Sequence, residues 1–478
     1  MSGLYSLKME QSESCIRQPK VTPDWEEALH LYEKMVACNS EALRVRATIK
    51  LARLSKHAPD NVLEHTIPIL VELLGSSHSS NSNMSIQEAA AYCLTCMARI
   101  GDGRLAIIIS ESSAISFLLN LLPNSNGNFR RVLIKFLWSL LTFGNHNRVF
   151  VARNGGLEIT INMLSSSADG SRRYLLEILS ALALLREVRR VIIGLGGLRF
   201  LVEATMSGSM ISRERACQAI GLLAVTRQAR HMLVELGVIP VLVELFRVGD
   251  SSTKLVAGNA LGVVSAHIGY IRPVGQAGAI PLYAELLRGP DPIGKEIAED
   301  VFCILALVDM NVVAIVDHLV RILREDNDEA KAAAADVLWD LSGYKHSVSI
   351  IRNSGAIPVL VDLLGSGSAE VREKVSGAIA QLSYNEVHQI ALADVGAIPI
   401  LIDMLHEESE ELRDNAAEAL VKFSEDPLHR DRMSEAFDVP AFQNMQSRLV
   451  QINTSDEHMA RSMRRMSIQQ LTWDPDLA

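Results

Sequence analysis

The chain has 478 residues, of which 48% are hydrophobic and 5% aromatic, and its net charge is −10. So large an apolar fraction excludes a chain that is disordered over most of its length. The scarcity of aromatic residues favours closely packed helices over a sheet-rich fold, and the negative charge disfavours non-specific binding to nucleic acid.

The cellular compartment is inferred from three features. The six cysteines have no framework spacing, which is typical of a reducing compartment. No apolar run approaches the roughly 18 residues that a membrane span needs. The first residues, Met1-Ser2-Gly3-Leu4, show no basic segment followed by an apolar one, so no secretory signal is predicted. We therefore expect a cytoplasmic protein, a nuclear protein or both.

The N-terminal part of the chain is less regular than the rest. Residues 1–22 are predicted to be a flexible lead-in. The amphipathic segment from Trp25 to Ala37 predicts a helix, and Leu43 to Ser55 matches Val371 to Ser383 further along the chain. We therefore interpret residues 23–64 as an N-terminal cap with a partial repeat.

From residue 65 onward one phrase recurs. Gly355-Ala-Ile-Pro-Val-Leu-Val-Asp-Leu-Leu364 returns 41 residues later as Gly396-Ala-Ile-Pro-Ile-Leu-Ile-Asp-Met-Leu405, and five spacings in the series are 41. A fixed period of this length predicts a stack of helical repeats over residues 65–436, followed by a C-terminal tail over 437–478. The copies begin at His65, Ser113, Gly155, Gly196, Gly237, Gly278, Ala314, Gly355 and Gly396.

The order of residue types within one copy predicts two helices. The glycine suits a left-handed residue that ends a preceding helix, and the proline suits the first turn of the next, where its missing N–H is not needed. After a Gly/Ser break, Val371, Val375, Ile379 and Leu382 follow at helical spacing. A single copy cannot cover its apolar faces, so the copies must stack.

These phrases resemble those of the armadillo-repeat proteins. The resemblance covers about residues 40–436 and implies an all-α solenoid, a right-handed superhelix of about nine to ten repeats. Each repeat would have a short first helix and two longer ones, and the third helices would line a groove for extended partner segments. HEAT repeats are the nearest alternative, but they pair two helices and lack the Gly-x-Ile-Pro phrase. The copies are also similar to plant-type and vacuolar armadillo proteins and to the repeat region of U-box ligases.

The resemblance also places groove positions by register. The import adaptors of the family, importin-alpha, clamp basic signals with Trp/Asn pairs on successive third helices. None of the matching pairs here is Trp/Asn, and Trp138 and Trp339 fall one residue short, so we expect them in the core and disfavour that activity. The predicted groove residues are Lys135, Ser139, Glu177, Gln218, Leu222, Asn259, Val263, Asp300, Ile304, Asp336, Asp340, Gln381, Glu418 and Lys422.

This groove would change in chemistry along its length. Ala181, Leu222, Val263 and Ile304 would make its middle apolar, whereas Asp300, Asp336, Asp340 and Glu418 would make its C-terminal part acidic. The hypothesis is a partner segment with apolar anchors and with basic residues toward the C-terminal repeats. If the register is off by one, Leu222 and Ile304 are instead core residues.

Charge is distributed unevenly along the chain. Residues 130–230 hold 15 Lys/Arg against 6 Asp/Glu, and residues 278–436 hold 13 against 29. The arginines of the basic block could bind acidic or phosphorylated segments or, less favoured because stacking aromatics are few, RNA; solvation alone is the other interpretation. They are Arg172, Arg173, Arg186, Arg189, Arg190, Arg213, Arg215, Arg227 and Arg230.

No motif predicts an enzyme, a cofactor or a metal site. Cys93 and Cys96 have redox spacing but no second pair, so we interpret them as core residues. In the tail, Arg464-Arg465-Met-Ser467 resembles a site for basophilic kinases, which makes Ser467 a candidate phosphorylation site. The predicted function is a non-enzymatic adaptor for protein segments. The alternative is a component of a ubiquitin-ligase pathway that lacks a U-box of its own.

Overall fold

The structure, a computed structural model, describes residues 24–76, 85–101, 103–142, 145–166 and 170–454. All regular elements within these ranges are helices, and they form an armadillo-like repeat solenoid, which confirms the predicted all-α fold class. By its packing the chain divides into two compact units, residues 1–147 (unit 1) and 148–478 (unit 2).

Unit 1 begins with the helices α1 and α2, followed by a two-helix repeat, α3 and α4, and then by a three-helix repeat, α5 to α7. Its helices are α1 (Trp25–Val36), α2 (Glu41–Leu54), α3 (Asp60–Gly75), α4 (Ile86–Met97), α5 (Arg104–Glu111), α6 (Ala114–Leu121) and α7 (Gly127–Thr142). Helix α8 (Asn145–Arg153) includes the boundary between the units. Helices α2, α4 and α7 are the third helices of their repeats, and each packs against the next.

Unit 2 continues the pattern to residue 454. Its repeats comprise α9 (Gly156–Ser166), α10 (Arg172–Ala183), η1 (Arg186–Val188), α11 (Arg189–Gly194), α12 (Leu198–Met206), α13 (Met210–Ala224), α14 (Arg227–Glu235), α15 (Val238–Val248), α16 (Ser251–Ser265), α17 (Ile268–Gln276), α18 (Ala279–Arg288), α19 (Pro292–Leu305), α20 (Asp309–Leu323), α21 (Asp328–Ser342), η2 (Lys345–Ser347), α22 (Val348–Asn353), α23 (Ala356–Leu363), α24 (Ala369–Leu382), α25 (Glu386–Asp394), α26 (Ala397–Met404) and α27 (Glu410–Ser424). Three further elements, α28 (Pro427–Arg430), η3 (Asp431–Met433) and α29 (Pro440–Thr454), complete the described part.

The repeat glycines separate the first helix of a repeat from the second. Gly237 has φ 77° and Gly396 has φ 82°, in the left-handed region that the sequence predicted for this position. The equivalent glycines Gly155, Gly196, Gly278 and Gly355 also have positive φ. The left-handed residue turns the chain sharply, so the first and second helices form an angle rather than one rod.

Two of the three repeats without this glycine have fused first and second helices; in the third, at Ser113, the extended residue Ser112 separates α5 from α6. Ala314 lies inside α20, a single helix of 15 residues, and His65 lies inside α3, which is 16 residues long. The backbone stays helical through both positions, so the helical hydrogen bonds continue from the first helix into the second. The copy at Ala314, which has alanine where most others have glycine, therefore differs from them in geometry as well as in sequence.

A second recurring feature, found in six repeats, is a hydrogen bond that ties the first helix to the third helix before it. A polar side chain near the start of the first helix donates to a carbonyl in the last turn of that third helix, where no intrahelical donor remains. Arg230 Nε donates to the Ala224 carbonyl at 2.8 Å, and Asn311 Nδ2 donates to the Leu305 carbonyl at 2.9 Å. The equivalent donors are Asn147, Ser347, Gln389 and Arg430.

The C-terminal region assigned to a tail contains one packed helix. Helix α29 lies against α27, and its side chains Phe442 and Met445 are buried. Phe442 meets the Phe437 ring edge to face at 5.5 Å between centroids. Ordered packing therefore continues past residue 436 as far as 454.

None of the described helices is by itself long and apolar enough to cross a membrane. Two bent pairs, α5 with α6 and α25 with α26, pass the length and composition test only when their halves are taken together, with bends of 75° and 90°.

Candidate functional site

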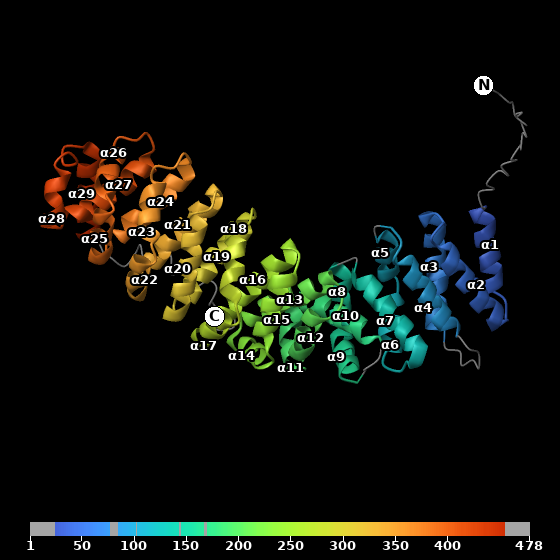
Figure 1. Ribbon diagram of the computed structural model, residues 1–478. Coiled ribbons are helices and arrows are strands. Elements are labelled where there is room, and N and C mark those ends of the chain that lie inside the picture. Colours follow the sequence, from blue (N-terminus) through green and yellow to red (C-terminus); the bar gives the residue numbers. More distant parts are fainter. Residues whose placement is uncertain (1–23, 77–84, 102, 143–144, 167–169, 455–478) are drawn as a thin grey trace, which may run out of the picture. The chain divides into compact units, whose positions relative to one another are not determined.

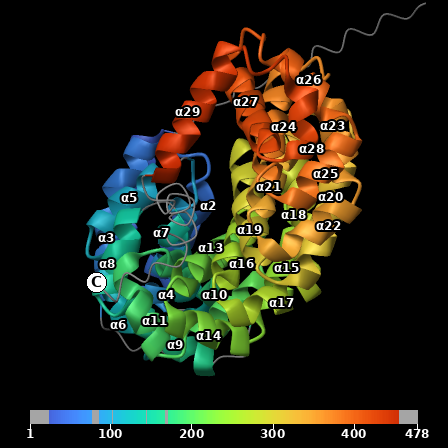
Figure 2. The same cartoon turned by 90° about the vertical axis from the view of Figure 1, so that its left-hand side faces the viewer.

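The third helices of unit 2 present a stripe of residues at equivalent positions, some of them exposed or half-buried and others buried. The seven helices α10, α13, α16, α19, α21, α24 and α27 follow one another, each packed against the next (Figure 1; Figure 2). On α13 the stripe comprises Ile211, Arg215, Gln218 and Leu222, at spacings that place them on one side of a helix. We call the corresponding residues from α10 to α27 the third-helix face of unit 2.

Carboxylates gather on this face where α19 meets α21. Glu299 and Asp300 come from α19, and Asp336 and Asp340 come from α21; all four are half-buried. We call these four residues the acidic cluster. The two helices together carry seven acidic residues against two lysines, so the local charge is strongly negative.

Burial and mutual repulsion act on these carboxylates together. Burial, followed by the charges of Asp336, Asp340 and Asp300, raises the pKa of Glu299 to about 7, while Lys374 opposes the shift. Burial also raises the pKa of Asp300, with Glu296 and Asp340 adding to the effect. Each ionised carboxylate in the cluster disfavours ionisation of the other carboxyl groups. A positive charge placed among them would favour ionisation of all four.

Two contacts show which groups approach the acidic cluster from within the chain. Lys374 Nζ, from α24, lies 3.4 Å from Asp336 Oδ1. The Cys303 thiol donates to Asp340 Oδ2 at 3.6 Å. Burial and then the charge of Asp340 raise the pKa of this thiol, so Cys303 stays protonated and acts as a donor.

The apolar positions predicted for the middle of the groove are mostly core residues. Ile304, Ala181 and Val263 are 1%, 3% and 7% exposed, and only Leu222 is half-buried. For Ile304 the alternative interpretation, a core residue, is the better description. Accessible apolar side chains lie nearer the start of three of the third helices, α13, α16 and α19, and sequence reasoning missed them: Ile211, Leu255, Val256, Ile293 and Ile297.

The remaining predicted groove residues of unit 2 differ in accessibility. Gln218 and Asn259 are exposed. Glu177 is 8% exposed and pairs with Arg173 at 3.2 Å. The Glu418 carboxylate accepts a hydrogen bond from the Tyr384 hydroxyl at 2.6 Å.

Lys422 lies on the same face near the C-terminal end of the array. It pairs with Glu425 at 2.9 Å and lies 4.7 Å from the centre of the Tyr384 ring. Its charge therefore already has local partners.

In unit 1, Lys135 is half-buried on α7, whereas Ser139 is 1% exposed and its hydroxyl donates to the Phe136 carbonyl. Ser139 is therefore inaccessible to a partner, because its position faces the helix packing.

The two tryptophans expected in the core are only half-buried. Trp339 Nε1 donates to Gln381 Oε1 at 3.3 Å, from α21 to α24. The Trp138 ring is covered by the Arg99 guanidinium at 5.6 Å from its centre. Each indole therefore contacts a residue of the neighbouring repeat instead of filling the interior. Trp339 does so through its N–H and Trp138 through its ring face.

The basic block does not form one surface, because several of its arginines are bound within the fold. Arg172 makes a bidentate pair with Glu203 and donates to the Leu164 carbonyl, and Arg213 donates to the Thr205 carbonyl. Arg230 is 5% exposed and caps α13. These three guanidinium groups hold helices together.

The other arginines of the block are spread over different elements. Arg173 and Arg215 lie on the third helices α10 and α13. Arg186, Arg189 and Arg190 lie on η1 and α11, where burial and then the charge of Arg186 lower the pKa of Arg189. Arg227 begins α14 and is exposed. A single anionic ligand would have to contact both the first and the third helices of neighbouring repeats to use them all.

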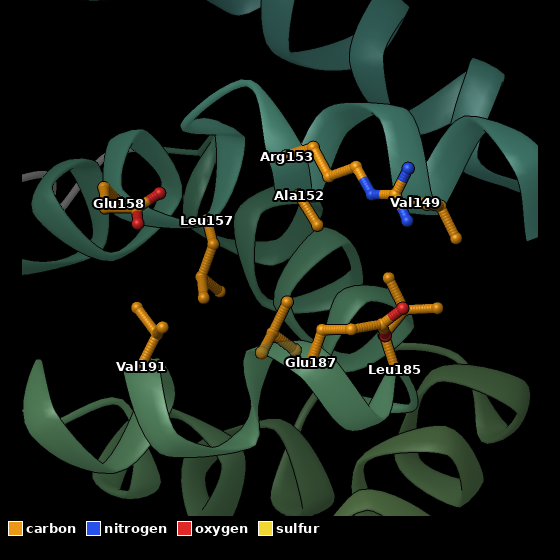
Figure 3. Close-up of a pocket in the computed structure, with 9 residues that line it drawn as sticks. Val149, Ala152, Arg153, Leu157, Glu158, Leu185, Glu187 and Val191 are labelled. Atoms are coloured by element: carbon orange, nitrogen blue, oxygen red, sulfur yellow. The ribbon is translucent and has the colours of Figure 1, made fainter.

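A recess of about 210 Å³ lies elsewhere in unit 2, between α8, α9 and η1/α11 (Figure 3). Figure 3 shows Arg153 and Val149 on one side and Leu185, Glu187 and Val191 on the other. Aliphatic side chains make up most of the lining. Its volume suits one apolar side chain rather than a cofactor.

The cysteine and phosphorylation predictions have different outcomes. Cys93 is fully buried, as expected of a core residue, but Cys96 is half-buried beside Tyr92 on α4. No group of three or more potential metal ligands occurs among the described residues. Ser467 lies outside the described residues.

Comparisons with known proteins agree on a helical repeat. A family model of HEAT repeats matches residues 316–421. A β-catenin structure, described with a phosphorylation switch that controls the interaction between cadherin and β-catenin, has a TM-score of 0.64 at 18% identity and covers 91% of this chain and 88% of that one. An engineered protein has a TM-score of 0.61 at 23% identity and covers 83% of this chain and 98% of that one. No curated protein matches the chain.

The HEAT match and the armadillo-like fold are compatible. The matched residues begin within α20, the fused helix that makes its repeat a pair, α20 and α21, as in HEAT repeats. The repeats that follow regain the left-handed glycine and three helices. The chain is thus an armadillo/HEAT-like repeat protein, and the likenesses to solved structures show its fold alone.

Proposed function

We propose that this armadillo/HEAT-like repeat protein is a non-enzymatic scaffold whose third-helix face in unit 2 binds an extended protein segment carrying basic and aliphatic residues. The acidic cluster is the observation that carries the proposal. The pKa of Glu299 is about 7 because burial, and then repulsion from the other carboxylates, is only partly offset by Lys374. A lysine or arginine from a partner would supply the missing positive charge.

The apolar part of the partner would contact α19 next to the acidic cluster. Ile293 is 60% exposed, and Ile297 follows it one turn later on the same side of the helix, with Asp300 after that. An extended segment with alternating side chains can place an aliphatic residue on this pair and a cationic residue on the carboxylates. Apolar contact would supply affinity and charge would supply register and selectivity.

Scaffolding is favoured over RNA binding by the positions of the arginines. Arg172, Arg213 and Arg230 bond to the chain's own carboxylates and carbonyls. The charges that remain accessible on α19 and α21 are predominantly negative, and phosphate groups would be repelled there.

A labelled peptide of alternating arginine and leucine residues tests the proposal by fluorescence anisotropy. Asp336→Lys combined with Asp340→Lys should weaken binding by about tenfold or more, since it reverses charge where the peptide's cation sits. The matched control, Asp362→Lys with Asp403→Lys, changes two exposed aspartates on the second helices α23 and α26. Circular dichroism checks that each variant folds. If a lysine variant does not fold, the same aspartates are replaced with asparagine instead. Equal affinities for all three proteins would overturn the proposal.

A further inference from the structure

A second charged surface, of opposite sign, lies on the third helices of unit 1. Helices α2, α4 and α7 pack side by side (Figure 1) and together contain seven Lys/Arg against two Asp/Glu. On α2, Arg46, Lys50 and Arg53 follow one another at helical spacing, and all three are exposed. On α7, Arg131 is exposed and Lys135 is half-buried.

The packing of α2 against α4, and of α4 against α7, brings these charges onto neighbouring helices. The positive charge of Arg53, on α2, acts on the Tyr92 hydroxyl of α4. Lys56, just after α2, and Arg99, just after α4, both act on the Cys96 thiol. We call the accessible side chains of this surface the basic face: Leu43, Arg46, Lys50, Arg53, Leu54, Lys56, Tyr92, Arg99, Arg131 and Lys135.

The two acidic residues of these helices do not neutralise the basic face. Glu88 is 7% exposed and accepts a hydrogen bond from Asn128. Glu41 begins α2, and one of its carboxylate oxygens, Oε1, is buried. Both carboxylates are thus drawn into the packing, whereas Lys50 and Arg53 are exposed, so the positive potential of the face persists at its exposed edge.

Apolar side chains are interleaved with the positive charges. Leu43 is 45% exposed, Leu54 is 36% exposed and Tyr92 is 41% exposed. Leu43 precedes Arg46 by three residues on the same side of α2, and Leu54 directly follows Arg53. A surface of this kind fits a ligand that alternates negative and aliphatic groups.

We propose that the basic face of unit 1 is a docking site for an acidic, leucine-containing segment of a partner protein, bound through Arg46, Lys50 and Arg53. An acidic protein segment fits this surface better than single-stranded RNA. Stacking of successive bases needs several free aromatic faces, whereas the basic face as defined contains a single aromatic side chain, Tyr92, and Arg99 covers the nearby Trp138 ring. The proposal is independent of the acidic cluster in unit 2.

The test uses the full-length chain and three labelled probes, measured by fluorescence anisotropy. The probes are a peptide of alternating glutamate and leucine, a peptide of alternating arginine and leucine, and a uridine oligonucleotide. The glutamate peptide should bind, with an affinity that falls as salt increases. Lys50→Glu combined with Arg53→Glu should weaken that binding by about tenfold or more.

The matched control, Lys34→Glu with Lys345→Glu, makes the same change in net charge at exposed positions outside the basic face. It should leave the affinity for the glutamate peptide within about twofold, because distant exposed charges are screened. Equal weakening by both double variants would overturn the docking site, and so would tighter binding of the oligonucleotide than of the glutamate peptide. The arginine peptide separates the two surfaces, because its binding depends on Asp336 and Asp340 and not on Lys50 and Arg53.

Discussion

Lys374 on α24 holds its ammonium group 3.4 Å from the carboxylate of Asp336 on α21. The acidic cluster therefore already accommodates one lysine of its own chain, in the way we propose for a partner's cation. The pair is partly exposed on both sides, so its net contribution to stability is small. Its importance is that Lys374 competes for the charge that a partner would use.

Replacing Lys374 with methionine should increase affinity for a basic peptide. Lys374→Met keeps an apolar stem of similar length and removes the competing charge, which should strengthen binding by about threefold to tenfold. Isothermal titration calorimetry with the arginine–leucine peptide measures the change, and Lys345→Met, at an exposed position on η2, is the control. Weaker binding by Lys374→Met would show that the lysine supports the site instead.

Glu299 should make stability depend on pH. Its pKa is about 7 in the folded chain, above the ordinary value of 4.5, so the folded state binds more protons than the unfolded state between these values. The free energy of unfolding therefore decreases as the pH rises from about 4.5 to about 7. Glu299→Gln should remove the loss and stabilise the protein at pH 8 by on the order of 1 kcal/mol after allowance for solvent screening.

Urea titrations of the wild type and the Glu299→Gln variant at pH 5 and pH 8 measure this effect. Glu285→Gln, at an exposed position on α18, makes the same chemical change away from the cluster. A wild type and a Glu299→Gln variant with parallel pH profiles would contradict the shifted pKa.

Arg230 should matter for folding and not for ligand binding. Arg230→Met leaves the last carbonyls of α13 without their buried donor, and we expect a loss of about 2–3 kcal/mol in unfolding free energy. Arg227→Met, three residues earlier and exposed, should change it by less than about 0.5 kcal/mol. Chemical denaturation compares the two variants. If both lose a similar, small amount of unfolding free energy, the hydrogen bonds from Arg230 to the carbonyls at the end of α13 are dispensable.

The left-handed glycines should tolerate no side chain. Gly396→Ala places a Cβ at φ 82°, which costs about 1–2 kcal/mol. At Gly194, in the last position of α11, a Cβ meets nothing within 4 Å and φ is ordinary, so Gly194→Ala should be neutral or slightly stabilising. Thermal unfolding distinguishes them; equal melting temperatures would remove the conformational argument.

The repeat architecture could be predicted from the sequence because its signals are local. A glycine that ends one helix and a proline that begins the next act within a few residues, and Gly237 and Gly396 have the expected conformation. The fused helix at Ala314 was not predicted, because a missing glycine alone does not decide it: the copy at Ser113 also lacks the glycine, yet α5 and α6 are separate. The helix α29 was not predicted either, because its packing on α27 depends on isolated residues such as Phe442 and Met445 and not on the period.

The candidate surfaces were only partly predictable because they depend on contacts between repeats. Asp336 and Asp340 were identified by register, but Glu299 lies one residue away from the chosen position and was missed. Counting arginines by sequence window could not reveal that Arg172 and Arg230 bond to the fold itself.

The basic face escaped attention for a related reason. The longer spacing between His65 and Ser113 breaks the 41-residue register before α4, so no groove positions were assigned on α4, and the match of residues 43–55 to residues 371–383 did not show which helix lies beside α2. The charges of Lys50 and Arg53 are brought beside α4 only by the packing of the helices.

A double-mutant cycle between the peptide and the acidic cluster tests the central claim most directly. The arginine–leucine peptide and a version with its central arginine replaced by norleucine are titrated into the wild type and into the Asp336→Asn/Asp340→Asn variant. If the cation lies on these carboxylates, the two changes are strongly non-additive, with a coupling of about 1.5 kcal/mol or more. Additive losses would show that the peptide's charge lies elsewhere and would contradict the proposed binding mode.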